Sequence, residues 1–87
     1  MHSYHHEQKA PRIPQFTPRE YDVIGWLVLA KTNYAIAKAL SVSEGAIENH
    51  LTSIYRKLNA YSRCEAVVAL LHLINDEHIV VPRHDAD

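Results

Sequence analysis

Apolar residues recur every three or four positions along most of the chain, which is the spacing of one face of an α-helix. The first such run consists of Val23, Ile24, Leu27 and Val28. Just before it, Thr17 and Glu20 have the spacing of a capping box, and Pro18 suits the first helical position. Phe16 is placed to fold back onto the first turns. The pattern predicts a helix from Pro18 that ends near residues 30–31.

Two further helical segments follow in the middle of the chain. The first is expected over residues 34–40, with Asn33 as its cap. The second is expected over residues 44–58, where Ser43 can cap the first turn and Asn59 suits a left-handed turn at the end. The apolar stripe of this second helix consists of Ile47, Leu51, Ile54 and Leu58.

The break between these two helices is short. Only residues 41–43 separate them, and the small Ala37 allows a steep packing angle, so the pair predicts a helix-turn-helix. The second helix of such a pair can lie in the major groove of DNA, whose width of about 12 Å admits one helix. With the apolar stripe turned inward, the base-facing candidates are Gly45, Ala46, Glu48, Asn49 and Thr52.

A fourth helix is expected over residues 63–75, opened by a capping box at Ser62 and Glu65. It is apolar on more than one side, and such a helix needs a second partner. The residues assigned to the core are Ala66, Val67, Leu70, Leu71 and Ile74. The remaining apolar residues, which extend beyond the side facing the core and which we call the apolar surplus, are Val68, Ala69 and Leu73. Either residues 79–81 fold back over this surplus, or it forms a dimer interface, and the sequence leaves both interpretations open.

The length of 87 residues fits one small domain. We divide the chain into a flexible lead-in over residues 1–15, a helical domain over residues 16–75 and an acidic tail over residues 76–87. The lead-in contains a histidine cluster, which we interpret as solvated because nothing nearby completes a metal site. Its members are His2, His5 and His6.

Charge gives weak support for a nucleic-acid partner. The formal net charge is −1, and residues 17–75 carry six basic and five acidic side chains. A strongly basic domain would be better evidence for DNA binding. The candidates for contacts with the DNA backbone are Arg19, Ser43, Arg56, Lys57 and Arg63. Helix capping explains Ser43 equally well, and cations near a helix C-terminus also favour its dipole, so Arg56 and Lys57 have a structural alternative.

Several classes of protein are excluded by the composition. The lone Cys64 rules out an intrachain disulfide and a cysteine-based zinc site. No apolar run reaches the roughly 18 residues of a membrane helix, and no signal peptide is visible. No glycine-rich phosphate loop or activated nucleophile is present, so we expect neither an enzyme nor a cofactor. A cytoplasmic protein with no membrane partner is expected.

Six motifs occur in order, without a gap, over residues 16–75. They are Phe16-Thr17-Pro18-Arg19-Glu20, Asn33-Tyr34-Ala35-Ile36-Ala37, Val42-Ser43-Glu44, Ile47-Glu48-Asn49-His50-Leu51, Ile54-Tyr55-Arg56-Lys57-Leu58, and Ser62-Arg63 with Glu65-Ala66-Val67. Together they resemble the LuxR-type (GerE-like) helix-turn-helix domain. Sigma-factor region 4 shares the central motifs, but Ser62-Arg63 favours the LuxR type. The resemblance implies an all-α, four-helix domain that binds DNA through its third helix, often dimerises through its fourth, and works at the bacterial nucleoid.

The sequence differs from this family on the DNA-facing side. The family often has basic residues at Gly45 and Glu48, and some members have them at Thr52 and Tyr61, which makes Tyr61 a further backbone candidate. Each lost phosphate contact weakens binding. An acidic Glu48 can still accept a hydrogen bond from cytosine N4, and Asn49 can pair with adenine, although Asn49 and Thr52 are equally compatible with plain solvation.

Two glycines of the family are also replaced, at Ala30 and Asn59. Asparagine tolerates the left-handed conformation, whereas alanine does so at a cost of roughly 1 kcal/mol. The turn after the first helix is therefore expected to differ in detail from the family.

Two functions fit these observations. The leading hypothesis is a sequence-specific transcriptional regulator that binds double-stranded DNA as a homodimer. The alternative is a DNA-binding-deficient interaction module, or antagonist, that pairs with another LuxR-type regulator through the fourth helix. The near-neutral charge, Glu48 and the apolar surplus favour the alternative. Titration with a mixed-sequence duplex discriminates between the two.

Overall fold

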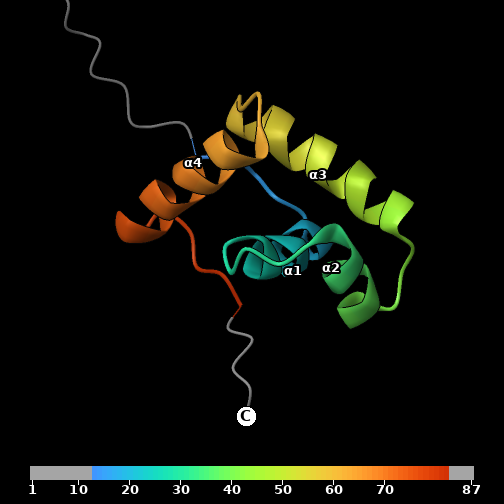
Figure 1. Ribbon diagram of the computed structural model, residues 1–87. Coiled ribbons are helices and arrows are strands. Elements are labelled where there is room, and N and C mark those ends of the chain that lie inside the picture. Colours follow the sequence, from blue (N-terminus) through green and yellow to red (C-terminus); the bar gives the residue numbers. More distant parts are fainter. Residues whose placement is uncertain (1–12, 83–87) are drawn as a thin grey trace, which may run out of the picture.

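The computed structural model of the chain describes residues 13–82, which form four helices and the segments that join them. The helices are α1 (Pro18–Leu27), α2 (Asn33–Leu40), α3 (Glu44–Leu58) and α4 (Arg63–Asn75). Figure 1 shows α3 and α4 meeting at an angle above α1 and α2. Because α3 contacts each of the other three helices, it is held from several directions. The all-α, four-helix prediction is confirmed. The histidine cluster of the lead-in lies outside the described residues.

The start of α1 is as predicted. Thr17 Oγ1 accepts a hydrogen bond from the Glu20 amide at 3.1 Å, and the Glu20 carboxylate accepts one from the Thr17 amide at 2.9 Å. These two bonds complete the capping box. Phe16 packs edge-on against Tyr21, with ring centroids 5.5 Å apart, as a hydrophobic staple does.

The end of α1 differs from the prediction, because the helix stops at Leu27 and not near residues 30–31. The amides of Leu29 and Ala30 donate to carbonyls three residues back, which tightens the chain into a turn. Ala30 then takes a left-handed φ of 62°. For an L-residue this conformation costs about 1–2 kcal/mol. The turn therefore keeps its left-handed residue even though the position is occupied by alanine.

The cap of α2 is Thr32, so the prediction of Asn33 is wrong by one residue. Thr32 Oγ1 accepts a hydrogen bond from the Ala35 amide at 3.1 Å. Threonine and asparagine both cap helices, so residue type alone does not choose between them. The Asn33 side chain instead accepts a hydrogen bond from Arg63.

The helices α3 and α4 begin and end where the sequence predicts. Ser43 and Ser62 cap them, each accepting a hydrogen bond from the amide three residues on. Asn59 takes the left-handed conformation at the end of α3, with φ 58°. The capping box at Ser62 is only half formed, because the Glu65 carboxylate accepts from the Tyr61 amide at 2.7 Å.

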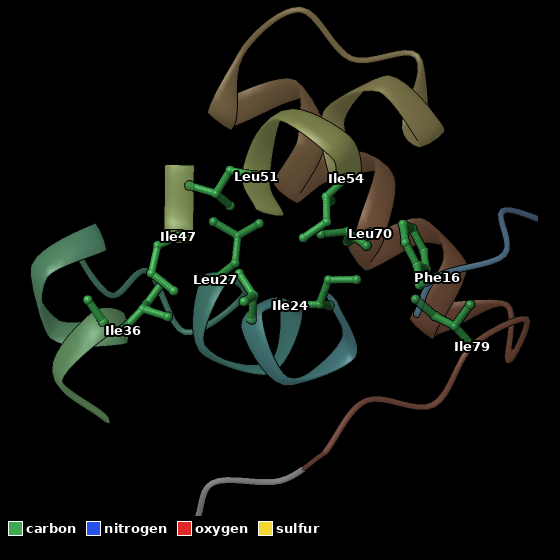
Figure 2. Packing of buried hydrophobic residues seen from close by; sticks show 11 residues of the cluster. Phe16, Ile24, Leu27, Ile36, Ile47, Leu51, Ile54, Leu70 and Ile79 are labelled. Atoms are coloured by element: carbon green, nitrogen blue, oxygen red, sulfur yellow. The ribbon is translucent and has the colours of Figure 1, made fainter. Parts of the chain in front are cut away.

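The core lies where the apolar sides of the four helices meet (Figure 2). It consists of Phe16, Val23, Ile24, Leu27, Ile36, Ala37, Ile47, Leu51, Ile54, Leu70 and Ile79. In Figure 2, Ile36 and Ile47 lie at one end of the core, and Phe16 and Ile79 lie together at the other end. The segments before α1 and after α4 thus close the core between them.

The segment after α4 covers one side of this helix and leaves another side exposed to solvent. Ile79 is 5% exposed and belongs to the core, so the segment after α4 does fold back. It leaves the outer side of α4 uncovered, because Val68 and Leu71 are each 47% exposed. The prediction that Leu71 faces the core is therefore wrong, and Leu73 is packed partly against the core. A helix that is apolar on nearly every side gives no pattern from which its orientation could be read.

Candidate nucleic-acid interface

One side of α3 is polar and exposed, and we call it the α3 outer face. It consists of Gly45, Glu48, Asn49, Thr52 and Arg56. These positions are three or four residues apart, so they lie one above another along the helix. The opposite side is fixed in the core by Ile47, Leu51 and Ile54. The structure thus brings four of the five predicted base-facing residues together, while Ala46 is half-buried at the edge of the face.

The side chains of this face are mostly without internal partners. Within residues 13–82, the Glu48 carboxylate and the Asn49 amide make no hydrogen bond or ion pair. Thr52 Oγ1 donates to the Glu48 carbonyl at 2.9 Å, which ties its hydroxyl to the helix backbone. At Gly45 a Cβ atom would meet only Ser43 Oγ, at 3.8 Å, and the backbone there is not left-handed. No contact in the described part of the chain therefore requires glycine at position 45.

Lys57, one of the predicted backbone contacts, is engaged inside the domain. Its ammonium group donates to Glu20 Oε1 at 2.7 Å and to the Gln15 carbonyl at 2.9 Å. Ser53 Oγ donates to the other carboxylate oxygen of Glu20 at 2.6 Å. The side chains of Glu20, Ser53 and Lys57 thus join the cap of α1 to two successive turns of α3.

The charge of Glu20 is stabilised by this arrangement. Burial by itself raises the pKa of Glu20, since a carboxylate is poorly solvated inside the domain. The hydrogen bonds from Lys57, Ser53 and the Thr17 backbone, with the nearby Lys57 charge, outweigh burial and hold the pKa below its ordinary value. Glu20 is therefore an ionised, almost fully buried group with all its bonding directed at α1 and α3.

Arg63 is likewise engaged inside the domain. Its guanidinium donates to Asn33 Oδ1 at 2.7 Å and to the Lys31 carbonyl. These bonds connect the start of α4 to the turn between α1 and α2. A planar guanidinium with several fixed donors suits this double contact, which an ammonium group would not reproduce.

The other predicted backbone contacts are differently placed. Arg56 is exposed and makes no ion pair with any residue from 13 to 82. Arg19 lies 3.3 Å from Asp22, in an exposed pair that contributes little and leaves the guanidinium accessible. Tyr61 is 88% exposed in the loop before α4. The Ser43 hydroxyl serves as the cap of α3.

Two further cations were not singled out by the sequence. Lys31 lies in the turn before α2 and Lys38 lies on α2, and both are exposed. The Lys38 ammonium lies 5.8 Å from the centre of the Tyr34 ring. Charge was the only feature that could have indicated them, because neither residue belongs to a helix cap or an apolar stripe. His50 is half-buried.

The outer side of α4 forms a second exposed surface, which we call the α4 apolar face. It consists of Cys64, Val68 and Leu71. An apolar groove runs beside it, lined by Leu27, Val28, Ala30, Arg63, Cys64, Val67 and Val68. Of the three residues predicted at a dimer interface, Val68 lies on this face. Ala69 and Leu73 line a separate groove, beside Lys57 and Leu58.

No group of three or more histidine, cysteine, aspartate or glutamate side chains in the described part of the chain could hold a metal ion. Among the four helices that the structure describes, none combines the length and apolar character needed to cross a membrane.

The chain is similar to known bacterial proteins. It is 40% identical to the spore germination protein GerE of Bacillus subtilis over 60 residues, which are 69% of this chain and 81% of GerE. It is 38% identical to the transcriptional activator protein BjaR1 of Bradyrhizobium diazoefficiens over 61 residues, which are 69% of this chain but only 25% of BjaR1. The chain thus spans most of one relative and a quarter of the other.

A solved structure and a family model agree with these relatives. A chain in the crystal structure of the anti-activator RapF complexed with the ComA DNA-binding domain matches with a TM-score of 0.61 and 45% identity. The match covers 63% of this chain and 95% of that chain. The family model described as bacterial regulatory proteins, luxR family, matches residues 14–70, which include α1, α2, α3 and the first part of α4. The chain therefore belongs to the luxR family of bacterial regulatory proteins.

Proposed function

We propose that this chain is a DNA-binding transcriptional regulator that places the α3 outer face in the major groove of double-stranded DNA. The observation that carries the proposal is the contrast between the two sides of α3. One side is fixed in the core, and the other presents polar side chains to solvent along a 15-residue helix. A helix of this kind fits the major groove and can reach base edges. Membership of a family of regulatory proteins supports the role.

We further propose that the chain acts as a homodimer through the α4 apolar face. Val68 and Leu71 are each 47% exposed on adjacent turns, and contiguous exposed apolar residues mark protein contacts. A two-fold dimer would present two copies of α3, and its DNA site would then be palindromic. Such a regulator acts at the nucleoid, in the bacterial cytoplasm.

A second candidate function is an interaction module without DNA affinity, which pairs with another LuxR-type regulator. One observation favours it: Lys57 and Arg63 are engaged internally, while Glu44 and Glu48 are exposed on α3. The solved structure with an anti-activator concerns a domain similar to this one, and it supports protein binding as a role for such domains.

Titration of a labelled mixed-sequence duplex at about 50 mM salt tests the two candidates, since backbone contacts alone give measurable affinity there. We expect the parent chain to bind, and Glu48→Lys to bind more tightly because it replaces a negative charge that the DNA polyanion repels with a positive charge that it attracts. The matched control is Glu77→Lys, which makes the same charge change at an exposed position beyond α4. If neither the parent nor Glu48→Lys binds, the second candidate is favoured. If the two lysine variants bind equally, α3 is not the contact element.

A further inference from the structure

We propose that Glu48 determines the sequence specificity of this domain by selecting a cytosine in the major groove. The inference rests on the proposed DNA-binding function. Glu48 lies at the centre of the α3 outer face, between Gly45 and Thr52, and its side chain is exposed. If α3 enters the major groove, this carboxylate is directed at base edges.

The charge of Glu48 is not neutralised within the domain. No described residue forms an ion pair or hydrogen bond with its carboxylate. Lys57 and Arg63 are directed at Glu20 and at the α1–α2 turn. Arg56 lies on the same side of α3 but eight residues further on, which is about 12 Å along the helix axis. Thr52 bonds the backbone carbonyl of Glu48 and leaves the carboxylate alone.

An ionised carboxylate can only accept hydrogen bonds. In the major groove, guanine presents acceptors at N7 and O6, and thymine presents an acceptor at O4, so all three atoms repel it. Adenine presents a donor at N6 beside an acceptor at N7, whereas cytosine presents the N4 donor alone. In a C·G pair only guanine O6 flanks the N4 donor, whereas in an A·T pair the N6 donor lies between adenine N7 and thymine O4, so cytosine is the base that meets Glu48 with the least repulsion.

Gly45 provides the space for this contact. It precedes Glu48 by three residues, so the two positions are adjacent on the helix surface. Glycine favours a helix less than alanine does, and no internal contact requires it here. The missing side chain leaves the first turns of α3 free to approach the base edges closely.

Selection of bound duplexes from a random pool tests the proposal, with the parent chain, Glu48→Gln and Glu44→Gln. We expect the parent to enrich one cytosine in each half-site, with a single C·G to T·A change lowering affinity about 5-fold to 100-fold. Glu48→Gln should shift that position toward adenine, because glutamine pairs with adenine N6 and N7. Glu44→Gln removes the same charge one turn earlier and should leave the preference unchanged.

The outcomes separate this inference from the proposed function. If the parent enriches a site but Glu48→Gln retains the same base preference at every position, Glu48 is not the selecting residue and DNA binding stands. The inference is also overturned if Glu44→Gln alters the preference as much as Glu48→Gln does. If no duplex is enriched by the parent, both the proposed function and this inference fail. Both substituted side chains are exposed, so circular dichroism should show unchanged helix content in each variant.

Discussion

Replacing Glu20 with glutamine would remove the charge that joins α1 to α3. The carboxylate accepts hydrogen bonds from Lys57 at 2.7 Å, from Ser53 at 2.6 Å and from the Thr17 backbone at 2.9 Å. Glutamine has nearly the same shape and can still accept at one position. Its second position becomes a donor, and the Lys57 ammonium loses its charged partner.

The magnitude follows from these contacts. A hydrogen bond to a charged group contributes about 1.5–3 kcal/mol and a neutral one about 0.5–1.5 kcal/mol, so each affected bond loses about 1 kcal/mol. The Lys57 and Ser53 bonds together give a loss of about 2 kcal/mol, because Glu20 is almost fully buried and solvent screens the pair only from the Lys57 side. For a domain of this size, that loss lowers Tm by about 8–16 °C.

Thermal unfolding followed by circular dichroism at pH 7 measures the effect. Asp22→Asn is the matched control, since it makes the same chemical change in the exposed Arg19–Asp22 pair, which contributes well under 1 kcal/mol. The reasoning is refuted if Glu20→Gln and Asp22→Asn lower Tm equally.

The pH dependence gives an independent check. Because the folded-state pKa of Glu20 lies below its ordinary value, its contribution to stability is fully present above about pH 4.5, the ordinary value. The contribution is lost as the pH falls through the folded-state pKa, where the carboxylate takes up a proton. The difference in stability between parent and Glu20→Gln should therefore be constant near neutral pH and narrow as the pH falls below about 4.5. A difference that widens in acid would contradict the assignment.

Three further predictions follow from individual contacts. Ala30→Gly should raise the free energy of unfolding, measured in urea, by about 0.5–1 kcal/mol, because the backbone strain that alanine suffers at φ 62° is larger than the extra conformational entropy that glycine loses on folding. A destabilised variant would show that the strain is absent. Leu71→Glu should convert a dimer to a monomer in light scattering with helix content unchanged, and an unaltered mass would exclude the α4 apolar face as the interface. Arg63→Ala should lower stability by about 1–2 kcal/mol while folded protein keeps its affinity for DNA; the reverse pattern would make Arg63 a phosphate contact.

The bounds of the helices were predictable where a local rule acts alone. Ser43 and Ser62 fix the starts of α3 and α4 because each caps an amide three residues on, and Asn59 ends α3 because asparagine accepts the left-handed conformation. The end of α1 was missed, since nothing in the local sequence shows that the chain tightens before Ala30. Thr32 and Asn33 can both cap a helix; Thr32 does so here, while the Asn33 side chain accepts a hydrogen bond from the distant Arg63.

The candidate interface was predictable to a smaller extent. The period of the apolar stripe in α3 determined which side faces solvent, so the α3 outer face followed from the sequence. The roles of Lys57 and Arg63 did not follow, because their partners lie more than 25 residues away along the chain and charge alone does not say what a cation faces. Which side of α4 faces the core could not be predicted either, because apolar residues occur on nearly every side of this helix.

The internal engagement of Lys57 and Arg63 has a consequence for how such a domain would search a chromosome. Within residues 13–82 it leaves four cations for phosphates, namely Arg19, Lys31, Lys38 and Arg56. The logarithm of affinity would then fall with the logarithm of salt concentration with a slope no steeper than roughly −3.6 per domain from these residues. The protein would therefore dissociate quickly from DNA of random sequence. Its residence time at a target would depend more on contacts with base edges than on contacts with the phosphate backbone.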